Sequence, residues 1–544
     1  MRFAGIWIEN VEGLEWKSIR NTTSSEYGDY FDTWKADGYR TIDIEAYDTP
    51  WGLRFAAIWW ENVDGLAWGQ LRNMDRDTYE DEADKQAAAG YLMTDYERYE
   101  TSSGTRYAAI WERPSSVPAY QVRTNRDELG FANLWRTYRD MGYRLADFES
   151  DVASPDRYGG IWLENASRFR YSRKSSLDSE IESYLASYQT DNGGVETGIS
   201  VAVVLDGEMI YRRGFGNADD AAGKVAHGET VYGFASVSKV IGGTLATLLE
   251  AGTTLRDGTS YSLDLSDPTS DYLSDDGMPS FHTHTLEQLA AHLGCVAHYP
   301  AVTTPGISNQ RTNFASAKDA LATIWNTGLV TSSTQFTGGC TIGNRWSYST
   351  PAFTFFAAAL EDATGKTIVE LLDEELFDPF GLRSMRVQFA GGSQVPDYDR
   401  AVHYDDDGTL ANLTGCDEGE ACDNTWKVLG GGIEGSAVDL AWFGWRVLDG
   451  QIVDAETRDD RMWTPVDDSC AAGTGTCMNG IAWALGQDRA GGRDIAEHGG
   501  AQMGARSHIR VYRDDGLVVA ILTNENDHNP RGLATTIGDI VLGP

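Results

Sequence analysis

The chain has 544 residues, of which 41% are hydrophobic, a share that supplies real apolar cores and excludes a mostly disordered protein. Acidic residues number 82 against 44 basic ones, so the formal net charge of −38 disfavours nucleic acid and anionic membrane surfaces as partners. Mean hydropathy is −0.38, and the sequence contains no run of about 18 apolar residues that could span a membrane.

The first third of the chain is a tandem repeat. Segments of the pattern Arg-aromatic-small-small-Ile-Trp recur at spacings of 52, 52 and 51 residues, at Arg2–Trp7, Arg54–Trp59, Arg106–Trp111 and Arg157–Trp162. A Gly-Tyr pair keeps the same period. Since periods of this size are typical of stacked supersecondary units, we predict a four-fold repeat domain over residues 1–174 whose fourth repeat is partial.

Each repeat unit is predicted to contain a strand that opens with the Arg-aromatic segment, then a loop, a helix and a closing strand. We expect a curved antiparallel sheet with helices on one side. The recurrent Ile-Trp tryptophans are interpreted as core residues rather than as a ligand-binding face. We identify no carboxylate pair or histidine cluster that recurs in register, and this part of the chain is therefore predicted to be non-catalytic.

Six cysteines all lie after residue 290. Their even number favours disulfides and export over a zinc site, because no Cys-x2-Cys spacing occurs. Short loops close most readily, which predicts the pairs Cys295–Cys340, Cys416–Cys422 and Cys470–Cys477. The first residues enter patterned sequence at once, so we expect a secreted protein whose signal peptide is not present in this chain.

A Ser-x-x-Lys motif, Ser236 to Lys239, is the first candidate for catalysis. It follows a predicted hairpin and opens an apolar helix that is predicted to run through Leu249. The spacing places both side chains on one face of the helix start, where a lysine can lower the proton affinity of a serine hydroxyl. We therefore predict Ser236 as nucleophile, with Ser238 on a different face. His282 and His284 are interpreted as surface or turn residues rather than metal ligands.

Two further segments supply the remaining groups. Tyr348-Ser349-Thr350 precedes a helix predicted over 352–363, and His498-Gly499-Gly500-Ala501 precedes two predicted strands. A tyrosine near a lysine can act as a general base, so Lys239 and Tyr348 are predicted to handle the serine proton, with Tyr348 as preferred base. The backbone N–H groups of Ser236 and Ala501 are predicted to form an oxyanion hole. His498 would orient or polarise this network, and no metal or cofactor is expected.

This order of motifs resembles the serine β-lactamase and penicillin-binding-protein superfamily, and within it the class C branch with its esterase and D-aminopeptidase relatives. The resemblance covers residues 175–544, and it includes Gly430-Gly431-Gly432 and Asp439, which are similar to the Gly-Gly … Ser-x-x-Asp segment of that branch. It implies an α/β sandwich in which helices flank an antiparallel sheet. Together with the repeats, the chain is thus predicted to be of the α+β class.

Two positions depart from the pattern of that superfamily. Thr350 stands where the Tyr-x-Asn motif has asparagine, so the amide that commonly holds a substrate carbonyl is missing, and Thr350 is itself a candidate substrate contact. His498-Gly499-Gly500 replaces Lys-Thr-Gly, a variant common in esterase- and peptidase-like members. Both changes argue against efficient β-lactam hydrolysis.

The Arg-aromatic repeats ahead of a class C-like domain resemble the polyglycine hydrolases, secreted proteases that cut Gly–Gly bonds in the linkers of plant chitinases. The resemblance implies an endopeptidase that acts through an acyl-enzyme on a protein or peptide substrate, such as a glycine-rich linker of a host protein. The repeats would serve as a docking platform. The alternatives are an esterase, a D-aminopeptidase or D-Ala carboxypeptidase, and a non-catalytic binding protein, although intact Ser236, Lys239 and Tyr348 argue against the last.

Overall fold

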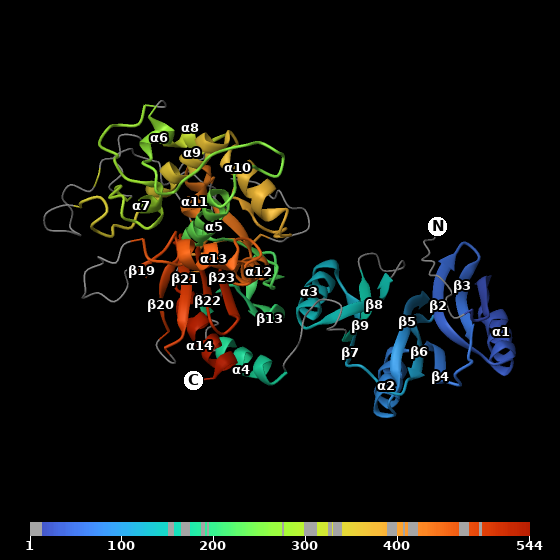
Figure 1. Cartoon of the computed structure of the whole chain (residues 1–544). Helices are drawn as coiled ribbons and strands as arrows, with labels where there is room; N and C mark the ends of the chain where they lie inside the picture. Colours follow the sequence, from blue (N-terminus) through green and yellow to red (C-terminus); the bar gives the residue numbers. More distant parts are fainter. Residues whose placement is uncertain are drawn as a thin grey trace. The chain divides into compact units, whose positions relative to one another are not determined.

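The chain divides into two compact units, Met1–Phe169 and Arg170–Pro544 (Figure 1). The structure, a computed structural model, describes residues 13–150, 157–164, 175–186, 191–192, 195–274, 277–298, 313–324, 329, 340–388, 400–405, 408–411, 423–466, 478–488 and 492–543. The predicted end of the repeat domain, residue 174, lies outside these residues.

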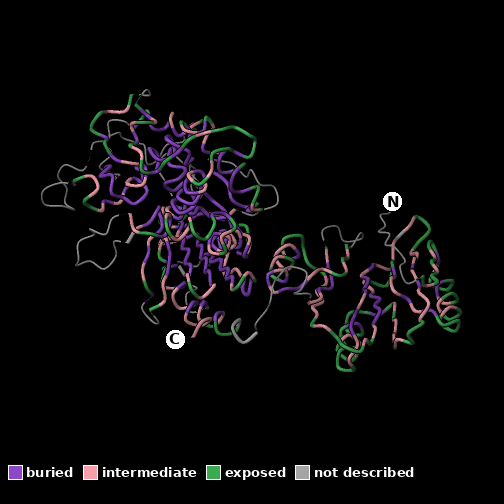
Figure 2. Tube along the Cα trace, viewed as in Figure 1, coloured by how far each residue is buried: buried purple, intermediate pink, exposed green. Residues whose placement is uncertain are grey.

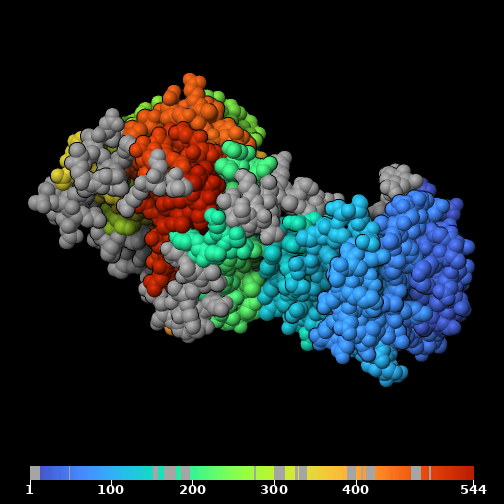
Figure 3. Space-filling view, turned by 90° about the horizontal axis from the view of Figure 1, so that it is seen from below, coloured from blue at the N-terminus to red at the C-terminus, as the bar shows by residue number. Residues whose placement is uncertain are grey.

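The first unit contains three described repeats, each built as strand, helix, strand, strand. The repeats consist of β1 (Trp16–Thr22), α1 (Ser24–Ala36), β2 (Tyr39–Thr49) and β3 (Gly52–Glu61); β4 (Ala67–Met74), α2 (Arg76–Ala88), β5 (Leu92–Thr101) and β6 (Gly104–Arg113); and β7 (Tyr120–Arg126), α3 (Glu128–Asp140), β8 (Tyr143–Ser150) and β9 (Tyr158–Glu164). In each repeat the last strand lies in the middle of a three-stranded antiparallel sheet, in the orders β1-β3-β2, β4-β6-β5 and β7-β9-β8. Figure 3 shows the three repeats following one another in colour from dark blue to cyan.

The expected antiparallel sheet with helices is confirmed, but the predicted phase of the repeat was wrong. The Arg-aromatic segment closes each unit as its central strand and pairs with a strand on either side. Arg157–Trp162, predicted to begin a partial fourth repeat, therefore lies largely in β9 of the third sheet. The segment Arg2–Trp7 lies outside the described residues.

The same local signals start and end each helix of the repeats. A side chain at the N-cap accepts a hydrogen bond from the backbone N–H three residues later, at Thr23, Asp75 and Asp127. Two residues earlier an asparagine takes a positive φ of 56–61° and interrupts the pairing register, at Asn21, Asn73 and Asn125. The glycine of the Gly-Tyr pair follows each helix with a φ of 80–90°, at Gly38, Gly90 and Gly142.

The tryptophans of the central strands form the core of each repeat, as predicted. Trp59, Trp111 and Trp162 are 0%, 1% and 0% exposed. Trp59 packs against Tyr27 of α1, with ring centroids 5.7 Å apart. Figure 2 shows buried positions along the strands of this unit and many exposed positions along its helices.

The second unit is built on a seven-stranded antiparallel sheet of order β13-β12-β23-β22-β21-β20-β19. The strands are β12 (Ile199–Leu205), β13 (Glu208–Phe215), β19 (Met478–Asn479), β20 (Ala484–Gln487), β21 (Asp494–Gln502), β22 (Ala505–Tyr512) and β23 (Leu517–Thr523). Alternate residues of the central strands point to opposite faces. One face packs on α4 (Ser175–Ala186) and α14 (Pro530–Leu542), and the other on α5 (Ser238–Glu250) and α12 (Ala437–Leu448). The predicted sheet flanked by helices is thus confirmed.

A helical lobe lies beyond one end of this sheet, with α5 between the two (Figure 1). It contains α6 (Ser270–Leu273), α7 (Leu286–Ala290), α8 (Ala317–Leu321), α9 (Pro351–Thr364), α10 (Ile368–Leu371) and α11 (Val428–Gly431). Both α5 and α9 are apolar around most of their circumference, as expected of helices buried on several sides. Over the described residues, no helix is long and apolar enough to cross a membrane.

Candidate active site

The turn before α5 presents the predicted nucleophile. A short 3-10 helix, η2 (Ala235–Val237), connects β16 (Val231–Gly233) to α5. Ala235 has a φ of +46° and is 2% exposed, a left-handed conformation that is unfavourable for a residue with a Cβ. Ser236 follows it and is partly exposed, whereas Ser238 is fully buried and its Oγ accepts a hydrogen bond from the Ile433 N–H. Ser236 is therefore the accessible hydroxyl of this motif.

The structure brings Ser236, Lys239 and Tyr348 together. Lys239 Nζ lies 3.2 Å from Ser236 Oγ, and the Tyr348 hydroxyl donates a hydrogen bond of 2.6 Å to the same oxygen. Lys239 comes from the first turn of α5, while Tyr348 lies three residues before the start of α9. Two proton-transfer groups thus contact one hydroxyl, at the distances expected of a nucleophile and its base.

Lys239 is held in an environment without a counterion. It is 0% exposed, and no carboxylate within the described part of the chain forms an ion pair with it. Its Nζ donates to the Gly430 carbonyl oxygen and lies 3.3 Å from Thr350 Oγ1. The ring of Tyr348, 4.9 Å away, favours the ammonium form, but burial outweighs it and lowers the pKa of Lys239 well below the usual lysine range.

The pKa of Tyr348 changes in the opposite direction to that of Lys239. Burial raises the pKa of its phenol above the ordinary value, and the hydrogen bond to Ser236 offsets this only in part. Tyr348 therefore stays a phenol at neutral pH and donates to Ser236 Oγ. Tyr348, the predicted base, is thus shifted toward its protonated form, whereas Lys239 is shifted toward its neutral form.

Two histidines hold the loop that carries Tyr348, and the sequence analysis had assigned them no role. The backbone N–H of Ser349 donates to His292 Nδ1 at 3.2 Å, and the N–H of Thr350 donates to His298 Nδ1 at 3.1 Å. The His292 ring also lies 4.4 Å from the Tyr348 ring. Burial lowers the pKa of both imidazoles, that of His298 to about 4, so each presents a neutral accepting nitrogen.

A disulfide joins the two segments that carry these groups. Cys295 and Cys340 are bonded, with their Cα atoms 5.7 Å apart. Cys295 lies between the two histidines, and Cys340 lies eight residues before Tyr348. The bridge therefore links the histidine segment to the tyrosine loop. The other predicted pairs, Cys416–Cys422 and Cys470–Cys477, lie outside the described residues.

The end of β21 lies against the nucleophile turn. A Cβ built on Gly500 would stand 2.2 Å from the Phe234 carbonyl oxygen and 3.1 Å from Ser236 N, so only glycine allows this approach. In the described residues, β20 pairs with β21 only from Asp494 to Glu497. The following residues, through the exposed Gly499 and Ala501, thus present an edge that β20 does not cover.

His498 and Thr350, both predicted as site residues, differ in their exposure to solvent. His498 is partly exposed, and its Nδ1 lies 2.7 Å from the Gly499 carbonyl oxygen. Burial and the charge of Lys239 lower its pKa, so the ring is neutral. Thr350, predicted as a substrate contact, is 1% exposed and faces Lys239. Its packing gives it a positioning role beside the lysine.

A second buried lysine, Lys427, was missed in the sequence. It ends the 3-10 helix η5 (Thr425–Lys427), is 7% exposed, and its Nζ lies 3.5 Å from Gln502 Oε1 at the end of β21. A Cβ on Gly431 would be 3.5 Å from both Lys427 Nζ and the Ala235 carbonyl carbon, which places the amine near the nucleophile turn. Burial and the charge of Lys239 lower its pKa to about 7. Its one sequence signal is its position just before the Gly430-Gly431-Gly432 segment.

The interpretation of His282 and His284 as surface residues was wrong. They are 1% and 0% exposed, because their rings pack against Phe355 of α9, that of His282 tilted and that of His284 edge-on. His284 bonds to Thr269 Oγ1 at 2.9 Å and to His282 at 3.3 Å. Among the described residues, no third metal-ligating group joins this pair.

Comparison with protein families finds two matches, in the order predicted. Residues 180–541 match the model of the β-lactamase family. Residues 13–62, 65–114 and 117–165 each match a model described as the polyglycine hydrolase-like structural repeat. These three segments coincide with the three described repeats and share their phase.

Individual relatives are distant. A D-aminopeptidase from Gluconobacter oxydans is 28% identical over 193 residues, which span 34% of this chain and 32% of the relative. An octameric penicillin-binding protein homologue from Pyrococcus abyssi is 19% identical, with a TM-score of 0.53 over 67% of this chain and 77% of that one. A D-amino acid amidase from Ochrobactrum anthropi is 19% identical, with a TM-score of 0.52 over 68% and 98%. The structural likenesses establish the fold of the second unit.

Proposed function

We propose, from the membership of this chain in the β-lactamase family, that it is a serine hydrolase that cleaves amide or peptide bonds through an acyl-enzyme. The observation that carries the proposal is the contact of Ser236 Oγ with both Lys239 Nζ and the Tyr348 hydroxyl, at 3.2 and 2.6 Å. A binding protein would have no physical need for a buried lysine without a counterion beside an accessible serine.

Lys239 is the base in this mechanism. As a neutral amine it has two N–H groups and one lone pair. The Gly430 carbonyl and Thr350 Oγ1 can accept the two N–H groups, which leaves the lone pair for the proton of Ser236. As Ser236 Oγ attacks the carbonyl carbon, its proton moves to Lys239. The Tyr348 phenol, beside the same oxygen, relays a proton to the departing amine.

The oxyanion is stabilised by backbone donors. Ser236 N lies at the start of η2, and β21 approaches it closely at Gly500, so the N–H groups of Ser236 and Ala501 are the proposed pair. Water then attacks the acyl-enzyme with Lys239 and Tyr348 in the reverse roles. His498, which is neutral, orients the strand through its bond to the Gly499 carbonyl.

We propose that the substrate is an extended glycine-rich linker, cleaved between glycines. The match of all three described repeats to the polyglycine hydrolase-like repeat supports this substrate. The uncovered edge of β21 offers backbone groups to an extended peptide, while Lys427 and Gln502 at its end offer side-chain donors to peptide carbonyls. We further propose that the protein is secreted, which the Cys295–Cys340 disulfide supports, since disulfides persist in oxidising compartments.

A D-aminopeptidase activity is the second candidate, and the Gluconobacter relative favours it. The two activities are compatible in one respect: glycine has no Cβ, so a subsite shaped for a D-residue also admits glycine. They differ in the substrate end that is recognised, because an aminopeptidase binds a free amino terminus and an endopeptidase does not.

One panel of substrates tests both candidates on the purified chain. It contains a glycine-rich protein linker with blocked ends, a D-alanyl peptide with a free amino terminus, a short acyl ester and a chromogenic cephalosporin. We expect cleavage of the blocked linker at Gly–Gly bonds and loss of all turnover in Ser236→Ala. Cleavage of the D-alanyl peptide with an intact linker would replace the endopeptidase by the aminopeptidase. Turnover of the ester alone would identify an esterase.

A further inference from the structure

A pair of carboxylates recurs in register through the repeats, contrary to our interpretation of the sequence. The strand that follows the helix of each repeat carries an Asp-x-Glu motif at a spacing of 52 residues, in β2, β5 and β8: Asp43 and Glu45, Asp95 and Glu97, Asp147 and Glu149. Residues two apart in a strand point to the same face. These six residues are called the acidic row below.

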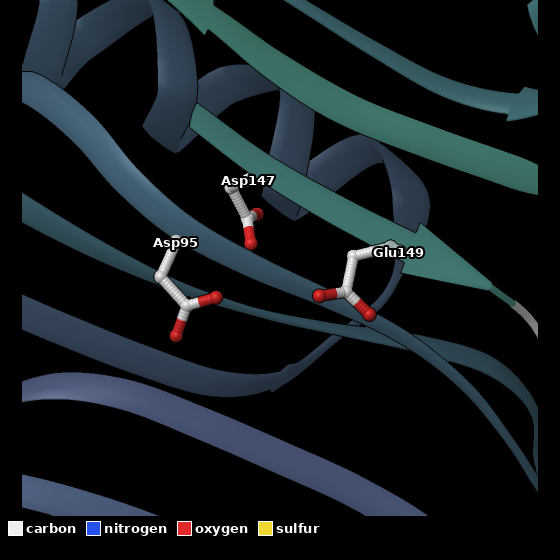
Figure 4. A group of neighbouring side chains, drawn as sticks. All are labelled: Asp95, Asp147 and Glu149. Atoms are coloured by element: carbon white, nitrogen blue, oxygen red, sulfur yellow. The ribbon is translucent and has the colours of Figure 1, made fainter. Parts of the chain in front are cut away.

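The fold gathers the acidic row between neighbouring repeats. Asp95 Oδ2 accepts a hydrogen bond of 2.7 Å from the backbone N–H of Ile44, so a residue of the second repeat is bonded to a strand of the first. Side-chain oxygens of Asp95, Asp147 and Glu149 all lie within 4.8 Å of one another. Figure 4 shows these three carboxylates pointing toward a common space between the second and third repeats.

No basic side chain neutralises the row. Within the described part of the chain, none of its six members forms an ion pair with a lysine or arginine. Arg98 and Arg157 line the small pocket beside Glu149, but Arg98 pairs with Glu100 at 3.2 Å. Asp95 and Glu97 are both buried among these carboxylates, where a charge without a partner is unfavourable.

Two carboxyl oxygens of the acidic row are buried without a hydrogen-bond partner, and one of them belongs to Glu97. It is only 3% exposed, and its carboxyl lies within hydrogen-bonding reach of Glu149. Its Oε1 is buried and has no hydrogen-bond partner, and the same holds for Asp147 Oδ2. A shared proton can link the Glu97 carboxyl to that of Glu149 or Glu45, but it gives Asp147 Oδ2 no donor. A cation beside these two oxygens would supply the missing partner.

We propose that the acidic row binds a divalent metal ion of the calcium type, with Asp95, Asp147 and Glu149 as ligands and Glu97 completing the site. Calcium takes 6–8 oxygen ligands at about 2.3–2.6 Å, so ligands on opposite sides of the ion are about 4.6–5.2 Å apart. The three carboxylates, within 4.8 Å of one another, fit this span. The ion would join β5 to β8 and so fix the second repeat to the third.

The full chain, freed of metal by a chelator, is titrated with CaCl2 in a calorimeter and melted with and without it. We expect about one tight equivalent per chain and a higher melting temperature. The double variant Asp95→Asn/Glu149→Gln should lose this equivalent. The control, Glu80→Gln/Asp81→Asn, removes the same charge from the exposed face of α2 and should keep it.

The control matters because a chain of net charge −38 attracts calcium without any site. Equal calcium binding by the two double variants would assign the heat to the surface and overturn the proposal. The proposal would also be overturned if the melting temperature of the wild-type chain is the same in chelator and in millimolar calcium. If the double variant fails to fold, the single variant Glu97→Gln provides the same comparison, with calcium affinity at least about ten-fold weaker as the expected result.

Discussion

The two units of this protein bury charged groups of opposite sign. The repeat unit encloses Asp95 and Glu97, and the β-lactamase unit encloses Lys239 and Lys427, each without an ion pair among the described residues. Burial pushes all four toward their neutral forms. A neutral lysine gains a lone pair and becomes a base, whereas a neutral carboxylic acid loses what a metal would bind. The same physical effect therefore favours a proton acceptor in one unit and, in the other, carboxyls that must lose their protons before the proposed cation binds.

The units also differ in how their cores are made. The β-lactamase unit has extended apolar layers on both faces of one sheet. Each repeat has a small, mainly aromatic core around one tryptophan, and the cores of the first two repeats include residues of the repeat that follows. A repeat is therefore stabilised largely by its neighbour.

The largest effect is expected from Ser236→Ala. Loss of the nucleophile should lower kcat by at least about 10⁴-fold and abolish labelling by a serine-directed phosphonate. Thermal unfolding should stay unchanged, because the hydroxyl is at the partly exposed turn. Ser183→Ala, an exposed serine on α4, serves as the matched control and should label like the wild type. Labelling of the Ser236→Ala chain at the wild-type rate would remove Ser236 from the mechanism.

The choice of base is tested by comparing Lys239→Met with Tyr348→Phe. A base with a lowered pKa is active above that pKa, so kcat/KM of the wild type should rise with pH along a limb that lies well below the range of free lysine. Lys239→Met should lower kcat by about 10²–10⁴-fold and remove this limb. Tyr348→Phe should slow the reaction but keep the limb. The reverse result would restore Tyr348 as the base.

In the repeat unit we expect a pH dependence of folding stability, and stability should fall with rising pH where kcat/KM rises. The groups facing one another in the row are Asp43 and Glu45 of β2, Asp95 and Glu97 of β5, and Asp147 and Glu149 of β8, with Arg98 and Arg157 nearby. Their raised pKa values mean that the folded state binds more protons than the unfolded state above about pH 4.

Without metal, stability should therefore fall as pH rises from about 5 to 8, by up to about 1.4 kcal/mol per pH unit for each proton involved. Denaturant titrations in chelator, followed by tryptophan fluorescence, measure this slope. Glu97→Gln should flatten it, and calcium should reverse it. If the change of stability with pH is the same in Glu97→Gln as in the wild type, the acidic row is not its cause.

The smallest effect is expected at Lys427. Lys427→Met keeps the length and apolar stem of the side chain but removes its donor near Gln502. We expect KM for the linker to rise by about ten-fold with little change in kcat, since the proposed role of the amine is to bind a peptide carbonyl rather than to transfer a proton. Lys318→Met, which removes an exposed lysine paired with Asp362, should leave both constants unchanged. A fall in kcat alone would place Lys427 in the chemistry instead.

The grouping of Ser236, Lys239 and Tyr348 could be predicted from the sequence because their motifs are local and ordered. Ser236 and Lys239 are one helical turn apart, and Tyr348 precedes a strong apolar helix. The tertiary contacts could not be predicted in this way: the left-handed backbone of Ala235 and the proximity of Lys427 depend on segments far apart in the chain.

The repeat unit was predicted with the right period and the wrong phase, because a periodic pattern does not show where its unit begins. The Asp-x-Glu pairs were visible at that period and were overlooked. Their burial could not be read from the sequence, since Asp43 and Asp147 occupy equivalent positions but are more exposed than Asp95, which lies in the middle repeat.

The hydrogen bond from Ile44 N–H to Asp95 has a direction: a backbone donor of one repeat meets a carboxylate of the next. Asp147 accepts in the same way from Tyr96, one module later. Duplication or loss of one whole 52-residue module keeps every donor matched to its acceptor, while an insertion within β2, β5 or β8 breaks the match. The array can therefore change its length during evolution in whole modules, without redesign of the surfaces through which the modules join.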